Sequence, residues 1–139
     1  MNDLISSFFN RITFGLYTPY CRRAKADISS KNFEKADLLF YTCADQKYFE
    51  FAILYPLFVL QRNPEAVVEI GICNLKKFKK KYAHLIDFYN KAYPKKILFS
   101  SVYAGNILPN SIRFLTQPHL KSRYVYIGDV DILILENIL

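Results

Sequence analysis

Four short apolar runs, separated by longer amphipathic stretches, constrain the fold of this chain more than any other feature of its sequence. Each run is rich in β-branched and aromatic residues, which is typical of a buried strand. Strands that alternate with helices form a mostly parallel sheet with helices on its faces, so the sequence predicts an α/β fold. The expected strands are Leu38–Ala44, Ala66–Asn74, Lys96–Val102 and Arg123–Asp129.

The stretches between these runs carry signals for helices. Asp45 can cap a helix over Gln46–Gln61, which Pro56 should kink or divide. Apolar residues at helical spacing predict a second helix over Leu75–Tyr93. A short third helix is expected within Ser111–Leu120. The apolar face of the second helix is Phe78, Tyr82, Leu85 and Tyr89.

The domain organisation follows from the same pattern. Residues 37–139 form one α/β domain, and the hydrophobic fraction of 52% is enough for a buried core. Residues 1–36 form a separate, helical N-terminal extension with scattered aromatic and basic residues. Two interpretations of this extension stand: a surface that touches a membrane interface, or helices that pack on the domain edge.

Cysteine usage and charge narrow the class further. The three cysteines Cys21, Cys43 and Cys73 are widely spaced, which argues against a disulfide framework and a thiolate metal site. A reducing compartment, the cytoplasm, fits best. No apolar run is long enough for a membrane span. The net charge of +7 attracts anions such as phosphorylated substrates.

Two carboxylates stand where the fourth expected strand ends. Asp129 and Asp131 are one residue apart, and Gly128 before them lets the backbone turn sharply or approach a ligand. Ligands of open α/β sheets bind outside the carboxyl ends of the strands. Mg²⁺ and Mn²⁺ prefer oxygen ligands and are commonly held by one or two carboxylates plus substrate phosphates. The alternative interpretation is a pair of surface carboxylates, one of which caps a helix.

Two segments together resemble a known family. RFLTQPHLKSRYVYIGDVDILILENI, residues 113–138, resembles the Asp-x-Asp segment of GT-A-fold glycosyltransferases, especially bacterial enzymes similar to family 8. DLLFYTCADQKYFEFAILYPLFVLQRNP and EAVVEIGICN, residues 37–74, are similar to the opening strand, turn, helix and second strand of that family. The resemblance implies a Rossmann-like nucleotide-diphospho-sugar transferase fold, of which this chain holds the N-terminal half and lacks the C-terminal part.

The resemblance also implies roles for the acidic motif. Asp129 and Asp131 would hold Mn²⁺ or Mg²⁺ on the donor diphosphate, with Asp131 the more direct ligand and Asp129 also reaching the ribose or the sugar. Val130 would lie near the ribose. Arg113 would approach the sugar or the diphosphate, where a guanidinium can contact phosphate oxygens in pairs.

Other positions follow from the first strand. Ala44, Asp45 and Tyr48 would border the nucleotide base, with Tyr48 stacking on it. Gly128 departs from the family, which usually has Leu there. The family's third metal ligand, commonly a His, lies beyond this chain, and its two histidines, His84 and His119, come too early in the sequence to serve.

The expected function is transfer of a hexose from a nucleotide diphosphate sugar to a glycan or lipid-linked glycan acceptor, with a UDP-sugar as the favoured donor. The expected place is the cytoplasm, where the enzyme could also meet the inner face of the membrane, and no nucleic acid partner is expected. The sheet edge left open by the missing half predicts oligomers. A dense lysine cluster is interpreted as a solvated helix face: Lys76, Lys77, Lys79, Lys80 and Lys81.

Two alternatives remain open. The first is a truncated, non-catalytic domain that binds a membrane or protein partner through its basic surface. The second is a haloacid-dehalogenase-like phosphatase, which also carries Asp-x-Asp after an apolar strand. That motif usually continues with Thr or Val at the position that Leu133 occupies here.

Overall fold

A four-stranded parallel sheet forms the centre of the protein. The structure is a computed structural model that describes residues 33–103 and 109–138. The strand order is β3-β2-β1-β4, and each pair of neighbours is parallel. The predicted α/β class is therefore confirmed, whereas most of the expected extension over residues 1–36 lies outside the described residues. The strands are β1 (Leu38–Ala44), β2 (Val67–Cys73), β3 (Ile97–Val102) and β4 (Tyr124–Ile127).

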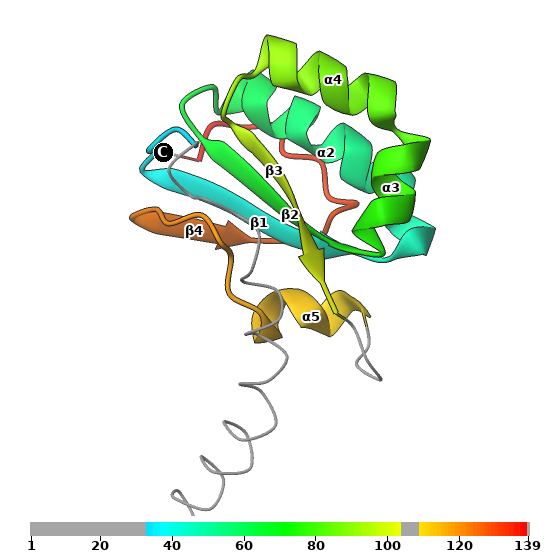
Figure 1. The fold of residues 1–139 in the computed structure, drawn as a ribbon. Coiled ribbons are helices and arrows are strands. Elements are labelled where there is room, and N and C mark those ends of the chain that lie inside the picture. The colour runs from blue at the N-terminus through cyan, green and yellow to red at the C-terminus, as the bar shows by residue number, and fades with distance from the viewer. Residues whose placement is uncertain (1–32, 104–108, 139) are drawn as a thin grey trace, which may run out of the picture.

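Helices cover both faces of this sheet (Figure 1). Three α-helices pack on one face, and α5 lies alone among the described helices on the other. None of the helices in the described ranges has the length and apolar character needed to cross a bilayer. The helices are η2 (Gln46–Tyr48), α2 (Phe49–Arg62), α3 (Leu75–Lys81), α4 (Ala83–Ala92) and α5 (Pro109–Leu115).

The helices break at other places than the sequence predicts. Pro56 lies inside α2, which is continuous, so the expected division there is wrong. The expected helix over Leu75–Tyr93 is instead two helices that meet at Tyr82, whose ψ of 25° departs from helical geometry. On α4, Ile86 packs on the core while Leu85 is 43% exposed, so the expected apolar face is wrong at Leu85.

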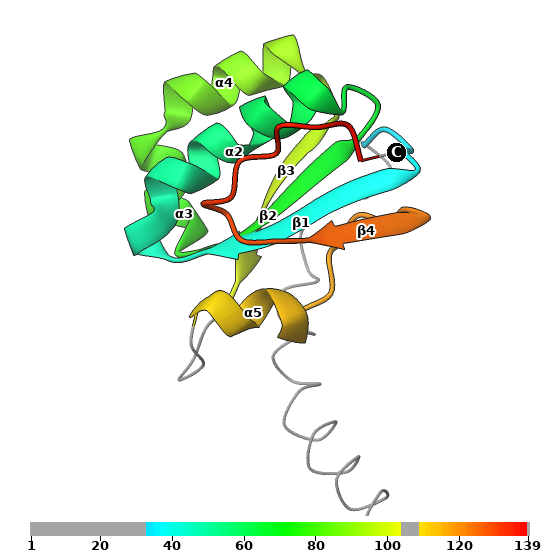
Figure 2. The same cartoon turned by 180° about the vertical axis from the view of Figure 1, so that it is seen from behind.

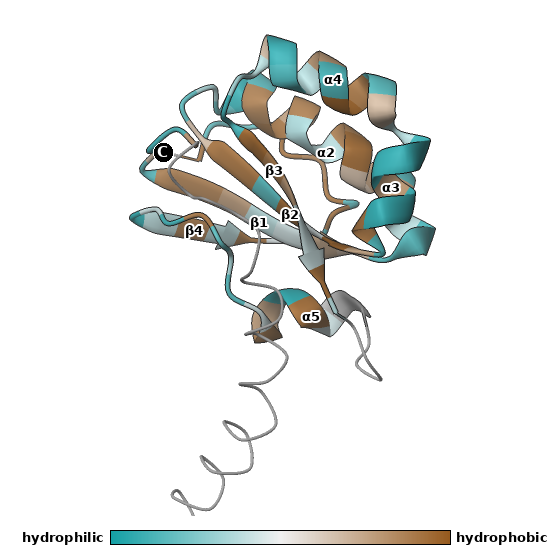
Figure 3. Cartoon of the chain, viewed as in Figure 1, coloured by the Kyte–Doolittle hydropathy of each residue, from teal (hydrophilic) through white to brown (hydrophobic). Residues whose placement is uncertain are grey.

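The larger core lies between the sheet and α2, α3 and α4 (Figure 3). Hydrophobic colour runs along the strands, and β1 is buried over its whole length. Phe78 of α3 is fully buried, with its ring 5.1 Å from the rings of Phe49 and Phe99. Its contacts therefore join α3 to both α2 and β3.

The chain after β4 folds back over the same core (Figure 2). Val130 and Ile134 are buried in it. The side chain of Asn63, at the end of α2, accepts a hydrogen bond from the Ile138 amide at 2.9 Å and donates one to the Glu136 carbonyl at 3.2 Å. These bonds hold the last described residues against α2.

Replacing Phe78 by Ala should lower the free energy of unfolding by about 3–5 kcal/mol, because it leaves a cavity among aromatic rings. Urea unfolding followed by circular dichroism measures this change. The matched control is Phe88→Ala on α4, where the side chain is 53% exposed, and its effect should stay near about 0.5 kcal/mol. Equal losses in the two variants would contradict this packing.

Candidate functional site

The topology creates a ligand-binding position between β1 and β4. The chain builds β1, β2 and β3 in one direction and then crosses the other face through α5 to place β4 on the far side of β1. The strand order therefore reverses between β1 and β4. In open α/β sheets, ligands bind outside the carboxyl ends of the strands at such a reversal.

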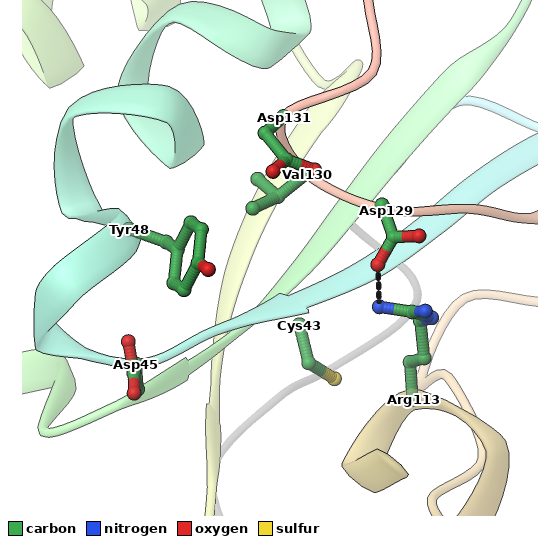
Figure 4. A pocket seen from close by; sticks show the side chains of 7 residues that line it. All are labelled: Cys43, Asp45, Tyr48, Arg113, Asp129, Val130 and Asp131. Carbon is green, nitrogen blue, oxygen red and sulfur yellow. Dashed lines mark ion pairs between the residues drawn. The ribbon is translucent and has the colours of Figure 1, made fainter. Parts of the chain in front are cut away.

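A pocket lies at this position (Figure 4). It encloses about 270 Å³ of empty space, part of it open to solvent. The segment after β1 forms one side, the segment after β4 forms the opposite side, and α5 contributes from below. Its lining residues are Cys43, Asp45, Tyr48, Arg113, Asp129, Val130 and Asp131.

Six of the seven residues that the resemblance selects line this pocket, and they come from three distant segments of the chain. The exception is Ala44, which is 3% exposed and belongs to the core below. Asp131 is exposed, and Tyr48 is half-buried on the other side of the pocket. Asp45 accepts a hydrogen bond from the Lys47 amide at 2.9 Å, which caps η2.

An ion pair lies at one side of the pocket. The guanidinium of Arg113 contacts Oδ1 of Asp129 through its Nη1 (Figure 4). The Arg113 side chain is 10% exposed and that of Asp129 is 41% exposed, so solvent screens the pair only on one side. The Nε of Arg113 is buried without a hydrogen-bond partner in the described part of the protein. The protein groups described thus leave one donor of the guanidinium unsatisfied.

A buried carboxylate holds the turn between α5 and β4. Glu69 lies in the middle of β2 on the face that α5 covers, and its side chain is fully buried. Its oxygens accept hydrogen bonds from the amides of His119 and Leu120 at 2.7 and 2.8 Å, and its Oε1 lies 2.7 Å from Nδ1 of His119. Three partners satisfy a charge that would otherwise be costly to bury.

Sequence reasoning missed Glu69, although a charge in the apolar run VVEIGIC was the available signal. Its partners fix the chain that leads from α5 into β4. Glu69 therefore positions Arg113 and Asp129 without touching either residue. The sequence excludes both histidines as the family's third metal ligand. In the structure, His119 contacts the Glu69 carboxyl group, and His84 is exposed on α4.

Cys43 is a second residue that the sequence did not single out. It lines the pocket from the end of β1, where it is 5% exposed. Its thiol donates to the Tyr41 hydroxyl at 3.4 Å, and that hydroxyl lies 2.6 Å from Oγ1 of Thr116. Burial raises the pKa of the Cys43 thiol. The thiol is therefore protonated at neutral pH.

The donor set can be tested against the expected cation. Asp129 and Asp131 are hard oxygen donors on one side of the pocket. Within residues 33–103 and 109–138, no group of three or more His, Cys, Asp or Glu side chains could hold a metal ion. Two carboxylates fit Mg²⁺ or Mn²⁺ only when phosphate oxygens and water complete the coordination. Zn²⁺, which takes three or four protein ligands, does not fit.

Gly128 allows a close approach, as the sequence predicts, but the group that approaches it is a side chain of the same protein and not a ligand. A Cβ at this position would lie 2.6 Å from the ring of Tyr126. That ring packs on Phe40 with a centroid distance of 5.2 Å, so its movement is restricted. The tyrosine ring thus occupies space that the Leu usual in the resembled family would need.

Comparisons with known proteins add no family. No family model, no curated protein and no solved structure matches the chain. The fold and the pocket define the class, an α/β protein with a parallel sheet and a polar site where its strand order reverses.

Gly128→Ala should lower the free energy of unfolding by about 1–3 kcal/mol, because the new methyl group meets the Tyr126 ring. The loss should shrink in a Tyr126→Leu background, where the ring is absent. A double-mutant cycle from chemical denaturation measures the coupling between the two positions. Strictly additive effects would show that the ring does not limit position 128.

The two described thiols should react slowly in the folded protein. Burial raises the pKa of Cys73 to about 11 and also raises that of Cys43, so few thiolates exist at neutral pH. At pH 8, alkylation of Cys73 should be slower than in urea by on the order of 100-fold, and it should accelerate as pH rises. Peptide mapping by mass spectrometry assigns each site. Equal rates in the folded and unfolded chain would contradict the burial.

Proposed function

We propose that this chain forms the donor-binding half of a metal-dependent glycosyltransferase, which transfers a hexose from a nucleotide diphosphate sugar to a glycan acceptor. One observation carries the proposal. Six residues selected by resemblance to GT-A-fold enzymes, and far apart in sequence, line a single pocket. The pocket stands at the carboxyl ends of parallel strands, where nucleotides commonly bind.

The charges of the pocket suit a diphosphate and a divalent cation together. Arg113 and Asp129 form an ion pair, so the pocket presents one positive and one negative group side by side. A diphosphate can replace Asp129 as the partner of Arg113, while a cation replaces Arg113 as the partner of Asp129. Each charged group then keeps an opposite charge, so little unpaired charge is created.

Asp129 and Asp131 would hold the cation, and Arg113 would hold phosphate oxygens. When bound, Mn²⁺ or Mg²⁺ stabilises the negative charge that develops on the leaving diphosphate. Tyr48, across the pocket from the acidic segment, offers an aromatic ring to the base. Glu69 keeps the α5–β4 connection in place through its three hydrogen-bond partners.

Two carboxylates alone do not complete the coordination of the cation. The cation and the nucleotide should therefore bind cooperatively, because the phosphates supply the missing ligands. Titration calorimetry with UDP should give a clear signal with Mn²⁺ or Mg²⁺ and little signal without it. Asp131→Ala should weaken UDP binding by at least about 100-fold, because even the outer partners of metal ligands cost about 10- to 100-fold when removed. The matched control is Asp87→Ala, since Asp87 is exposed on α4, a helix that contributes no residue to the pocket lining.

Three results would overturn the proposal. Metal-independent UDP binding would remove the role given to the carboxylates. No binding of UDP with either metal would favour the alternative of a non-catalytic domain that binds a membrane or protein partner. Stable covalent labelling of Asp129 by a phosphate analogue would instead favour the haloacid-dehalogenase-like alternative.

A further inference from the structure

The outer edge of β4 lacks a neighbouring strand in the described part of the chain. β4 is last in the order β3-β2-β1-β4 and pairs with β1 alone (Figure 2). The amides of Tyr124 and Gly128 donate to carbonyls of the β1 segment, those of Asp37 and Tyr41. Because amide directions alternate along a strand, Val125 and Ile127 present their backbone groups outward.

The side chains along this edge are apolar and exposed. Val125 is 44% exposed and Ile127 is 41% exposed. The register places them beside Leu39 and Tyr41 of β1, on the face of the sheet that α5 covers. Leu39 and Tyr41 are buried there, whereas Val125 and Ile127 are exposed. The elements that cover this face of β1 therefore do not extend over β4. The strand contains neither a charge nor a proline to block pairing with another chain.

Charges of opposite sign flank the strand symmetrically. Arg123 and Asp129 each lie three residues from Tyr126, Arg123 directly before β4 and Asp129 two residues after its end. Two antiparallel copies of this segment, related by a two-fold axis at Tyr126, therefore place Arg123 of each copy opposite Asp129 of the other. Moving the axis by one residue in either direction takes Arg123 and Asp129 out of this register.

The backbone geometry agrees with this register. With the axis at Tyr126, Val125 of one copy faces Ile127 of the other, and their outward backbone groups can exchange hydrogen bonds. The two side chains then lie on the same face, where apolar cross-strand pairs stabilise a sheet. A two-fold contact of this kind closes on itself and does not grow into fibres.

We propose that β4 pairs antiparallel with β4 of a second copy of this chain, about a two-fold axis at Tyr126, so that the two sheets become one. The inference does not rest on the proposed function, because it uses the edge of β4 and not the pocket. Asp129 belongs to both places, so each copy would bring Arg123 close to the pocket of the other.

The mass in solution tests the proposal. Light scattering after size exclusion should give twice the chain mass of 16.3 kDa at micromolar concentrations. Val125→Lys should give the monomer, because it sets a charge into the apolar pair. The matched control is Leu85→Lys on α4, where the native side chain is 43% exposed, and it should stay dimeric. Circular dichroism verifies that both variants are folded.

Cysteine cross-linking tests the register. Tyr126→Cys should form a disulfide between copies under mild oxidation, because residues on the axis face each other with Cα atoms about 4.5 Å apart in such a pair. Tyr124→Cys should not, since it faces Gly128 of the other copy. The proposal is overturned by a monomeric wild-type chain, by larger aggregates in place of a dimer, by a dimer that survives Val125→Lys, or by cross-linking at 124 rather than 126.

Discussion

The parallel pairing of β1 with β4 is the contact on which the rest of the structure depends. It joins segments that are far apart in the sequence, such as Leu38 and Tyr124. The loop entropy lost in such a pairing must be offset by contacts formed afterwards. Those contacts include the burial of Val130 and Ile134 and the bonds of Asn63 to the last described residues.

The same pairing produces both the pocket and the open edge of the sheet. At the carboxyl end of the two strands, it brings Asp129 and Asp131 across from Tyr48. Along its side, it leaves an apolar strand without a neighbour in the described ranges. Asp129 lines the pocket and also flanks the open edge of β4. The site and the edge are therefore linked through Asp129.

The strands could be predicted from the sequence to within one or two residues, because buried parallel strands are continuous apolar runs. The run Leu38–Ala44 is β1 without change. The grouping of the pocket residues also followed, since the carboxyl ends of parallel strands share one edge. Whether they bind a metal and a nucleotide remains a proposal, since that prediction rests on a resemblance that the comparisons do not extend.

Other features needed three-dimensional information. The break at Tyr82 has no breaking residue in the sequence, and the helical spacing of the apolar residues continues across it. In the sequence, Glu69 is an unexplained polar residue within an apolar run. Its role follows only from its hydrogen bonds to His119, which is far away in the sequence. The ion pair of Arg113 with Asp129 forms because α5 crosses the face of the sheet opposite to α2, α3 and α4. No local sequence pattern specifies that crossing.

The buried sulfur of Cys43 has a consequence for chemical modification of this pocket. Burial raises the pKa of the thiol, and the residue is only 5% exposed, so the sulfur is both a poor nucleophile and hard to reach. Oxidants and alkylating reagents should therefore spare the end of β1 for as long as the sheet stays folded.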